Sequence, residues 1–469
     1  MTRKAVIERL QSGFDDGGFL EELAERVAVP TESQVPESAP HLRRYLETLI
    51  GPELDAMGYA VEIVDNPVPD GGPFLIARRF EGEDLPTVVT YGHGDVVRGL
   101  AGDWQENRDP WTLDVVGERV YGRGVVDNKG QHTINMRALK AVIAERGRLG
   151  FNSVFLMETS EEIGSPGIHE LCAERRDDLK GDVLIASDGP RVAAARPTIW
   201  LGARGAINLD LRVRLRDGGH HSGNWGGLLA NPGVILANAL SAIIDRNGRV
   251  NVRGILPERI TNSVRQALAE IAVDPGPDGP TIDADYGEPG LTPTERVYGW
   301  NTFDILAFRT GNPDNPVNAI PPEAVANCQI RYTVDRDRDA FIPALRAFLD
   351  DNGFPEVEVY EAPGRSAWGA TRLDLDNPWV AWASASVERT LGERPAILPN
   401  IGASLPNDAF VEKLGLATIY VPHSYPGCSQ HAPNEHGLLP IFREGLAMMG
   451  GLFWDIGENP EPFLAARSE

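Results

Sequence analysis

Histidines and carboxylates follow β-like apolar runs in five separated segments of this chain. The segments read YGHGDVV, GRGVVDNKG, METSEEIGSPG, IASDGP and SQHAPNEH. One nitrogen or oxygen ligand from each segment would suit two zinc-class ions that share one bridging carboxylate. The five candidates are His93, Asp127, Glu162, Asp188 and His431.

Two further acids lie beside these candidates. Asp95 comes two residues after His93, so both side chains share one face at the end of a strand. A strand end is often simply polar, but here Asp95 can orient the imidazole of His93. Glu161 and Glu162 are adjacent, a pattern typical of a solvated surface pair. Because they follow an apolar strand, one can bind metal and the other can act on a water as a general base.

Several candidates have simpler interpretations. Asp127 might only begin a helix, and Asp188 might only form a turn. GRGVVDNKG lacks both phosphate-binding glycine spacings, so we reject a nucleotide loop. His436 and Cys428 are rival ligands near His431. A Ser-His-Asp triad is possible in principle, but the sequence has no GxSxG elbow of the kind that commonly positions the serine.

Alternating strand and helix signals surround these segments. Such alternation predicts an α/β domain, a mostly parallel sheet with helices on both faces. Ligands of such sheets lie beyond the carboxyl ends of the strands, where the candidate residues fall. The predicted strands are 74–80, 87–96, 152–160 and 182–188, and the predicted helices are 18–29, 38–57 and 128–146.

The pattern changes near residue 199 to alternating strands in a β-α-β-β-α-β order, typical of a small α+β domain. The small domain thus interrupts the large one, and residues 274–293 read as an irregular insertion. We predict a large domain at 1–198 and 367–469, and a small one at 199–366. The elements of the small domain are 205–216, 230–246, 303–311, 324–334, 337–352 and 357–363, and those after it are 377–391, 396–402 and 417–423.

Composition excludes some partners. Asp and Glu number 68 against 44 Lys and Arg, a formal charge of −24 that repels nucleic acid. No basic amphipathic stretch or long apolar run indicates membrane binding. The N-terminus has no signal-peptide pattern. Three widely spaced cysteines suit a reducing compartment, so we expect a cytoplasmic protein.

The motifs resemble, in order and spacing, the metallopeptidase family of carnosinases, aminoacylases, acetylornithine deacetylase and succinyl-diaminopimelate desuccinylase. DPW at 109–111 is similar to the family's DPF. The resemblance spans nearly the whole chain. It implies that His93 and Asp188 hold one metal, Glu162 and His431 hold the other, and Asp127 bridges them. It also implies Glu161 as general base and Asp95 as the partner of His93.

The carnosinase branch offers the most detailed match. HHSGNWGG resembles its HSGxxGG, which implies that His221 reaches the active site of a partner subunit; His220 is the rival. NAIP, CQIRYTV and GAS are similar to the elements that hold a substrate carboxylate, which points to Asn318, Arg331, Gly402 and Ser404. Asn128 stands where that branch usually has an acid, and no Asp-Leu precedes HSG. The resemblance further implies a homodimer formed through the small, lid-like domain.

These observations predict a di-metal hydrolase. It would cleave an amide bond of a dipeptide or an N-acyl amino acid with a free carboxylate, using a metal-activated water and Glu161 as base. Zinc is the expected metal, with manganese or cobalt as alternatives. An aminohydrolase acting on an aromatic or xenobiotic C–N bond is the alternative within this class. A non-catalytic metal-binding relative is disfavoured because the base and every ligand candidate are present.

Overall fold

An eight-stranded sheet forms the centre of the large domain in the computed structural model, which describes residues 2–273, 280–364 and 367–460. Four neighbouring strands, β6, β3, β7 and β16, run parallel, and β15 runs parallel to β8. The pairs β1–β2, β2–β6 and β16–β8 are antiparallel. The prediction of a mostly parallel sheet is therefore confirmed. In sheet order the strands are β1 (Ala60–Val64), β2 (Phe74–Arg79), β6 (Asn152–Glu158), β3 (Thr87–His93), β7 (Val183–Ala186), β16 (Ala417–Tyr420), β8 (Thr198–Trp200) and β15 (Ala396–Leu398).

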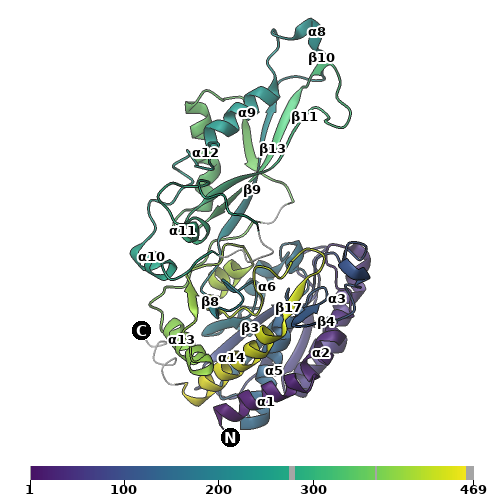
Figure 1. Cartoon of the computed structure of the whole chain (residues 1–469), viewed down its shortest axis with the longest axis vertical. Coiled ribbons are helices and arrows are strands. Elements are labelled where there is room, and N and C mark those ends of the chain that lie inside the picture. Colours follow the sequence, from purple (N-terminus) through teal and green to yellow (C-terminus); the bar gives the residue numbers. More distant parts are fainter. Residues whose placement is uncertain (1, 274–279, 365–366, 461–469) are drawn as a thin grey trace.

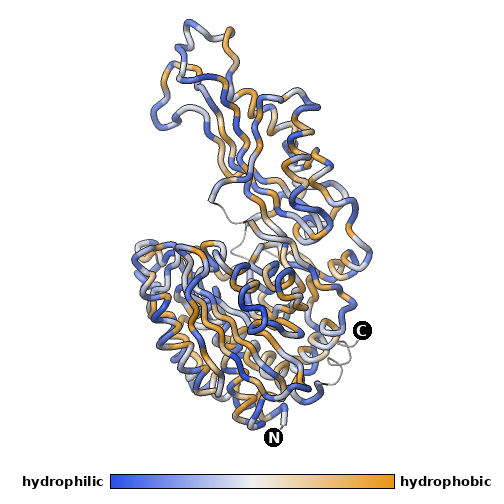
Figure 2. Tube along the Cα trace, turned by 180° about the vertical axis from the view of Figure 1, so that it is seen from behind, coloured by the Kyte–Doolittle hydropathy of each residue, from blue (hydrophilic) through white to orange (hydrophobic). Residues whose placement is uncertain are grey.

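Hydrophobic cores cover both faces of this sheet, because successive side chains of a strand point to opposite faces. Leu75 and Ala77 of β2 belong to one core, and Phe74 and Ile76 belong to the other. Figure 2 shows the central strands of this domain as largely hydrophobic. The first core packs against α1 (Arg3–Asp15), α2 (Gly18–Val27), α5 (Lys129–Arg146), α13 (Pro378–Leu391) and α14 (Leu439–Glu458), and the second against α6 (Ile168–Glu174) and α10 (Asn262–Leu268).

Shorter elements complete the large domain. The predicted helix 38–57 is divided into α3 and α4 by a π-helical turn at 46–50. A three-stranded sheet lies beside the main one and brings residue 436 close to residue 121. These elements are α3 (Ala39–Tyr45), α4 (Gly51–Ala56), β4 (Asp114–Val116), β5 (Arg119–Tyr121), α7 (Arg176–Leu179), α11 (Pro293–Tyr298) and β17 (His436–Leu438).

The small domain, which we call the lid, projects from the large domain (Figure 1). Its antiparallel sheet has the order β11-β13-β9-β14, and α9 and α12 pack on one face, so its chain order is the predicted β-α-β-β-α-β. A two-stranded ribbon, β10 with β12, lies with α8 at the far end of the lid (Figure 1). The lid elements are β9 (Gly205–Arg214), β10 (His220–His221), α8 (Ser222–Trp225), α9 (Pro232–Ile243), β11 (Thr302–Thr310), β12 (Ala319–Ile320), β13 (Glu323–Tyr332), α12 (Phe341–Asp351) and β14 (Glu358–Glu361).

The predicted domain limits stay a prediction, and helices α10 and α11, which fall inside the predicted small domain at 199–366, pack against the second core of the large domain. Strand β8 spans the predicted limit at 198/199, and the lid sheet begins with β9 at Gly205. The predicted limit at residue 366 and residues 274–279 of the predicted insertion lie outside the described residues.

Candidate di-metal active site

Three parallel neighbours in the sheet end at the same edge of the large domain. Strand β3 ends at His93, β6 at Glu158 and β7 at Ala186. Asp127 precedes α5, whose positive N-terminal end favours a nearby carboxylate. The fold thus carries ligand candidates from four distant segments to one edge, and a loop before β17 adds His431.

The first group of potential ligands contains His93, Asp127 and Asp188. The Nε2 atom of His93 lies 3.1 Å from Oδ1 of Asp127 and 3.9 Å from Oδ2 of Asp188. One atom from each residue lies within 4.8 Å of the others. All three residues are buried, so this group could hold one metal ion away from bulk water.

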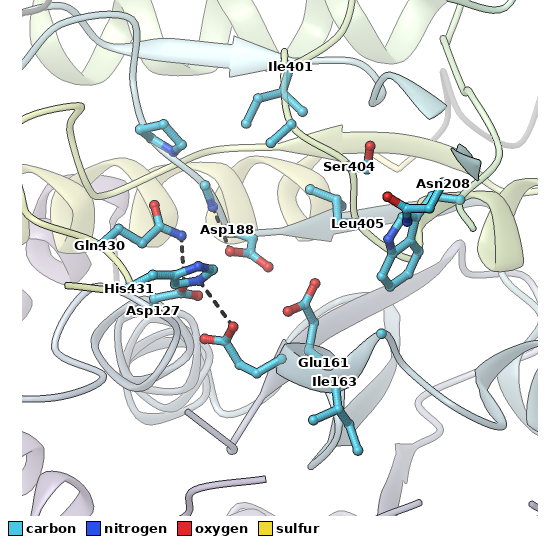
Figure 3. A pocket seen from close by; sticks show the side chains of 16 residues that line it. Asp127, Glu161, Ile163, Asp188, Asn208, Ile401, Ser404, Leu405, Gln430 and His431 are labelled. Atoms are coloured by element: carbon cyan, nitrogen blue, oxygen red, sulfur yellow. Dashed lines mark hydrogen bonds and ion pairs between the residues drawn. The ribbon is translucent and has the colours of Figure 1, made fainter. Parts of the chain in front are cut away.

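The second group contains Asp127, Glu162 and His431. The Nε2 atom of His431 lies 2.9 Å from Oδ2 of Asp127 and 3.1 Å from Oε2 of Glu162. Asp127 therefore faces both groups, one with each carboxylate oxygen. Figure 3 shows His431 and Asp127 together on one side of the pocket.

The charges of this cluster favour cations. Burial raises the pKa of Glu162 to about 7 and that of Asp188 to about 6, and the nearby charge of Asp127 adds to both shifts. Burial would also raise the pKa of Asp127, but hydrogen bonds with His431 and His93 lower it below its usual range. Buried Oε1 of Glu162 has no hydrogen-bond partner among the described residues. Two divalent ions would satisfy these oxygens, so the donor set fits the predicted metals.

Glu161 is placed differently from its neighbour. Its carboxylate forms no hydrogen bond or ion pair with any described residue, whereas that of Glu162 contacts His431. Figure 3 shows the carboxylates of Glu161 and Asp188 facing each other across the pocket. Burial, together with the charges of Glu162 and Asp188, raises the pKa of Glu161 well above its usual value. A free carboxylate here can exchange a proton with a water or with a substrate.

Asp95 connects two of these segments. Nδ1 of His93 lies 3.4 Å from Oδ1 of Asp95 and 3.1 Å from its backbone oxygen. The same carboxylate accepts hydrogen bonds, each 3.1 Å long, from the backbone N–H groups of Glu161 and Glu162. The predicted partner of His93 therefore also holds the turn that carries both glutamates.

Glu435 and Gln430 were not predicted to take part in the site. The buried carboxylate of Glu435 accepts hydrogen bonds from the backbone of Gly124, Val126 and Asp127 and from Arg123. Gln430 donates to Oδ2 of Asp127 at 2.6 Å. Only the position of Glu435, four residues after His431, hinted at this role, since its partners lie more than 300 residues away.

The rival ligands lie elsewhere. His436 is in β17, with Nε2 2.6 Å from the hydroxyl of Tyr425 and Nδ1 2.9 Å from the carbonyl oxygen of Asn434. Cys428 is buried. Neither belongs to a metal-binding group found among the described residues.

A cavity of about 470 Å³ opens over the cluster. Its lining includes Asn208 from the lid, Trp368 from the returning chain and Ser404 from the large domain. Oγ of Ser404 accepts a hydrogen bond from Arg331 at 3.1 Å and donates to the carbonyl oxygen of Arg204. Of the residues predicted to bind a carboxylate, Ser404 thus lines this cavity, Arg331 contacts it through Ser404, and Gly402 accepts from Arg204 nearby.

His221 and Asn318 are remote from this cavity. They lie at the far end of the lid, where the carbonyl oxygen of Asn318 accepts a hydrogen bond from the backbone of Ser222 (Figure 1). His221 is exposed, and its Nδ1 accepts from the backbone N–H of Gly223. The proton of the neutral ring therefore lies on Nε2, which is free to donate. The half-buried rival His220 contacts Trp225 edge-on.

The sequence matches the model of peptidase family M20/M25/M40 over residues 89–455. The chain belongs to this family. It is 32% identical to a human β-Ala-His dipeptidase over 97% of this chain and 93% of that protein. It is 29% identical to a cysteinylglycine-S-conjugate dipeptidase from Corynebacterium striatum over 90% of each chain. Matches to the mouse and rat β-Ala-His dipeptidases span about half the length of those proteins, 54% of each.

The fold agrees with solved structures. The crystal structure of human carnosine dipeptidase 1 aligns with a TM-score of 0.76 over 98% of this chain and all of that one, at 22% identity. The predicted fold class is confirmed, and so is the predicted membership of the metallopeptidase family. None of the helices in the described parts of the chain is both long and apolar enough to span a membrane.

Proposed function

We propose that this protein is a di-metal dipeptidase whose site is the cluster around Asp127. The observation that carries the proposal is the pair of three-residue groups that share Asp127 beside the unengaged carboxylate of Glu161. Two relatives align over at least 90% of their own length, the human β-Ala-His dipeptidase and the Corynebacterium striatum cysteinylglycine-S-conjugate dipeptidase. Their names support a dipeptide as substrate rather than an N-acyl amino acid.

The residues have distinct tasks in this proposal. His93 and Asp188 would hold one ion, Glu162 and His431 the other, and Asp127 both. The ions would polarise the scissile carbonyl group and lower the pKa of the attacking water. Glu161 would accept a proton from that water and deliver it to the leaving amine. Arg331 and Ser404, with Gly402 beside them, would bind the substrate carboxylate, for which a guanidinium fork is well suited.

Zinc is our proposed metal. A site of histidine nitrogens and carboxylate oxygens also accepts manganese and cobalt, so availability decides among them. A panel assay tests both proposals. Metal-depleted protein is supplied with each metal in turn and assayed with dipeptides, N-acetyl amino acids and N-aromatic-acyl amino acids. We expect the fastest turnover with dipeptides, and no turnover without metal. Preference for the acyl substrates would contradict the dipeptidase assignment.

We further propose a homodimer that forms through the lid. Strand β11 is a sheet edge and exposes Ile305, Leu306 and Phe308, each of which is 42–52% accessible as a residue. An exposed apolar sheet edge is a typical site for pairing with a second chain. Such pairing would also offer His221 and Asn318 to the neighbouring active site. Leu306→Glu should convert a dimer to a monomer in sedimentation experiments, whereas a wild-type monomer at micromolar concentration would contradict the proposal.

A cytoplasmic location remains our proposal as well. It is supported by Cys172, Cys328 and Cys428, which are all buried and unpaired, as expected in a reducing compartment.

A further inference from the structure

The cavity over the metal cluster has two chemically different parts. Every ionisable side chain in its lining belongs either to Glu161 or to a metal-ligand candidate. The rest of its described lining is uncharged, and most of it is apolar. An uncharged wall offers no compensation to a charged group that leaves water, so it favours an uncharged group. The apolar part includes Trp368, Ile401 and Leu405.

Trp368 belongs to the segment that returns from the lid to the large domain. Its backbone N–H donates to the carbonyl oxygen of Ala206 at 3.0 Å, and its carbonyl oxygen accepts from the N–H of Ala206 at 3.1 Å. This is antiparallel pairing, in which opposed side chains lie on the same face. Asn208 follows two residues later on β9 and shares that face. The lid therefore presents the indole ring and the side chain of Asn208 together, and both residues line the cavity.

The position of Trp368 is fixed by both domains. The hydroxyl of Tyr332 in the lid donates to the carbonyl oxygen of Trp368 at 2.9 Å. The next N–H, that of Gly369, donates to Oδ2 of Asp408 in the large domain at 2.6 Å. A Cβ atom at position 369 would lie 2.8 Å from Cβ of Asp408, so this close approach requires glycine. The half-buried indole ring forms no hydrogen bond with a described residue, which leaves its surface available to a ligand.

This wall lies away from the loop of His431. Figure 3 shows Asn208, Ser404 and Leu405 on the side of the pocket opposite His431. Under the proposed function, the scissile carbonyl group lies at the metals and the substrate carboxylate lies near Ser404. The C-terminal residue of a dipeptide then spans the distance between them, and its side chain lies beside Leu405 and the indole ring.

We propose that this wall selects dipeptides whose C-terminal side chain is apolar and uncharged. That side chain packs on Trp368 and Leu405, and its burial favours binding in proportion to the apolar area removed from water. An ammonium group in the same place loses its water and gains no opposite charge from the wall. The inference rests on the proposed dipeptidase function and adds the class of substrate, which neither the metal-ligand candidates nor the carboxylate contacts specify.

Two dipeptides that differ at the end of one side chain test the inference. Glycyl-norleucine and glycyl-ornithine have C-terminal side chains of equal length, but the first ends in a methyl group and the second in an ammonium group. The kcat/KM of the metal-loaded protein should be higher for glycyl-norleucine by about tenfold or more. Titration calorimetry of metal-loaded Glu161→Gln should show the same preference in Kd without turnover. Equal kcat/KM values would overturn the inference and leave the dipeptidase function intact, whereas no turnover of any dipeptide would overturn both.

Variants identify the wall. Asn208→Asp adds a negative charge at constant side-chain size, and Oδ1 can still accept the 3.0 Å hydrogen bond from Gln329. It should shift the ratio of the two kcat/KM values toward glycyl-ornithine by about tenfold or more, because the wall then offers the ammonium group an opposite charge. Trp368→Ala should lower kcat/KM for glycyl-norleucine more than for glycyl-ornithine, because it removes apolar surface.

The controls make the same changes away from the cavity. Asn238→Asp adds a charge at an exposed position of α9 in the lid, and Trp382→Ala removes a half-buried indole ring from α13. Both should keep the wild-type ratio of kcat/KM values. An unchanged ratio in Asn208→Asp, or an equal shift in Asn238→Asp, would overturn the inference even if Trp368→Ala did not fold.

Discussion

At the scale of single residues, Glu161 and Glu162 show how adjacent acids acquire different chemistry. The short turn after β6 sends Glu162 toward His431 and leaves Glu161 facing the cavity. The backbone of both is held by the carboxylate of Asp95. Position relative to the other segments, rather than residue type, separates the proposed ligand from the proposed base.

Glu161→Gln should therefore keep bound metal and folding but lower kcat by roughly 10²–10⁴, the scale of general acid–base help. Glu162→Gln is the matched control, because it makes the same chemical change one residue later and should reduce metal content. Metal analysis and steady-state kinetics of both variants check this. If Glu161→Gln lost metal while Glu162→Gln retained it, the two roles would be reversed.

Metal removal should make stability depend on pH in a defined direction. In the metal-free protein, burial raises the pKa of Asp188 to about 6 and that of Glu162 to about 7. A carboxyl group with a raised pKa binds more protons in the folded state than in the unfolded state. Its contribution to stability is therefore present below its ordinary pKa and is lost as pH rises through the raised value. The raised pKa of His431 acts in the same direction at higher pH.

We expect zinc to raise Tm more at about pH 7.5 than at about pH 5, because the metal-free carboxylates repel most when ionised. Thermal unfolding with and without zinc at each pH provides the measurement. The comparison removes the effect of the chain's overall acidity, which is common to both samples. An equal rise in Tm at both pH values would contradict the expectation.

At the scale of elements, two loops far apart in sequence are joined through Glu435. It comes from the loop that carries His431, and its carboxylate binds the turn that carries Asp127. Its ion pair with Arg123, 2.8 Å long, is fully buried. The Glu435 side chain therefore fixes the loop of His431 against the turn of Asp127, the residue proposed to contact both ions.

Glu435→Gln should reduce the free energy of unfolding by about 3–5 kcal/mol, because Arg123 would keep a buried charge without its partner. Metal affinity should fall as well. Urea unfolding of Glu435→Gln, Arg123→Gln and the double variant tests the coupling. We expect the double variant to be less destabilised than the sum of the single variants, and additive losses would show that the pair is not coupled.

At the scale of the whole molecule, His221 lies too far from the cavity to serve its own chain in this arrangement. It projects from the far end of the lid, beyond the exposed edge of β11 (Figure 1). A two-fold dimer through that edge would bring the same surface of two chains together. The free Nε2–H of His221 could then donate to the oxyanion in the neighbouring site.

Mixing inactive His221→Ala chains with inactive Glu161→Gln chains should restore activity after subunit exchange. One site of each mixed dimer would contain both an intact Glu161 and an intact partner His221. His220→Ala mixed with Glu161→Gln serves as the comparison for the rival histidine. If exchange were proven by a size-tagged chain and no activity returned, His221 would not act across the interface.

Local patterns in the sequence determined the strands and the residues at their ends. His93, Asp127 and Asp188 could be predicted as neighbours because parallel strands place their carboxyl ends on one edge. The alternation along β9 and β13 likewise predicted the lid sheet. These features depend on residues adjacent in sequence and on a regular period.

Only the tertiary structure decided which side chains meet across long separations. Three contacts join segments from different domains or distant loops: Glu435 with the turn before α5, Arg331 with Ser404, and Arg204 with the carbonyl oxygen of Gly402. Helix α14 was not predicted either, and most of its residues are buried in the first core of the large domain. The distance from His221 to the cluster likewise depends on how far the lid projects. Such relations follow from packing and burial of the complete chain, which no local pattern records.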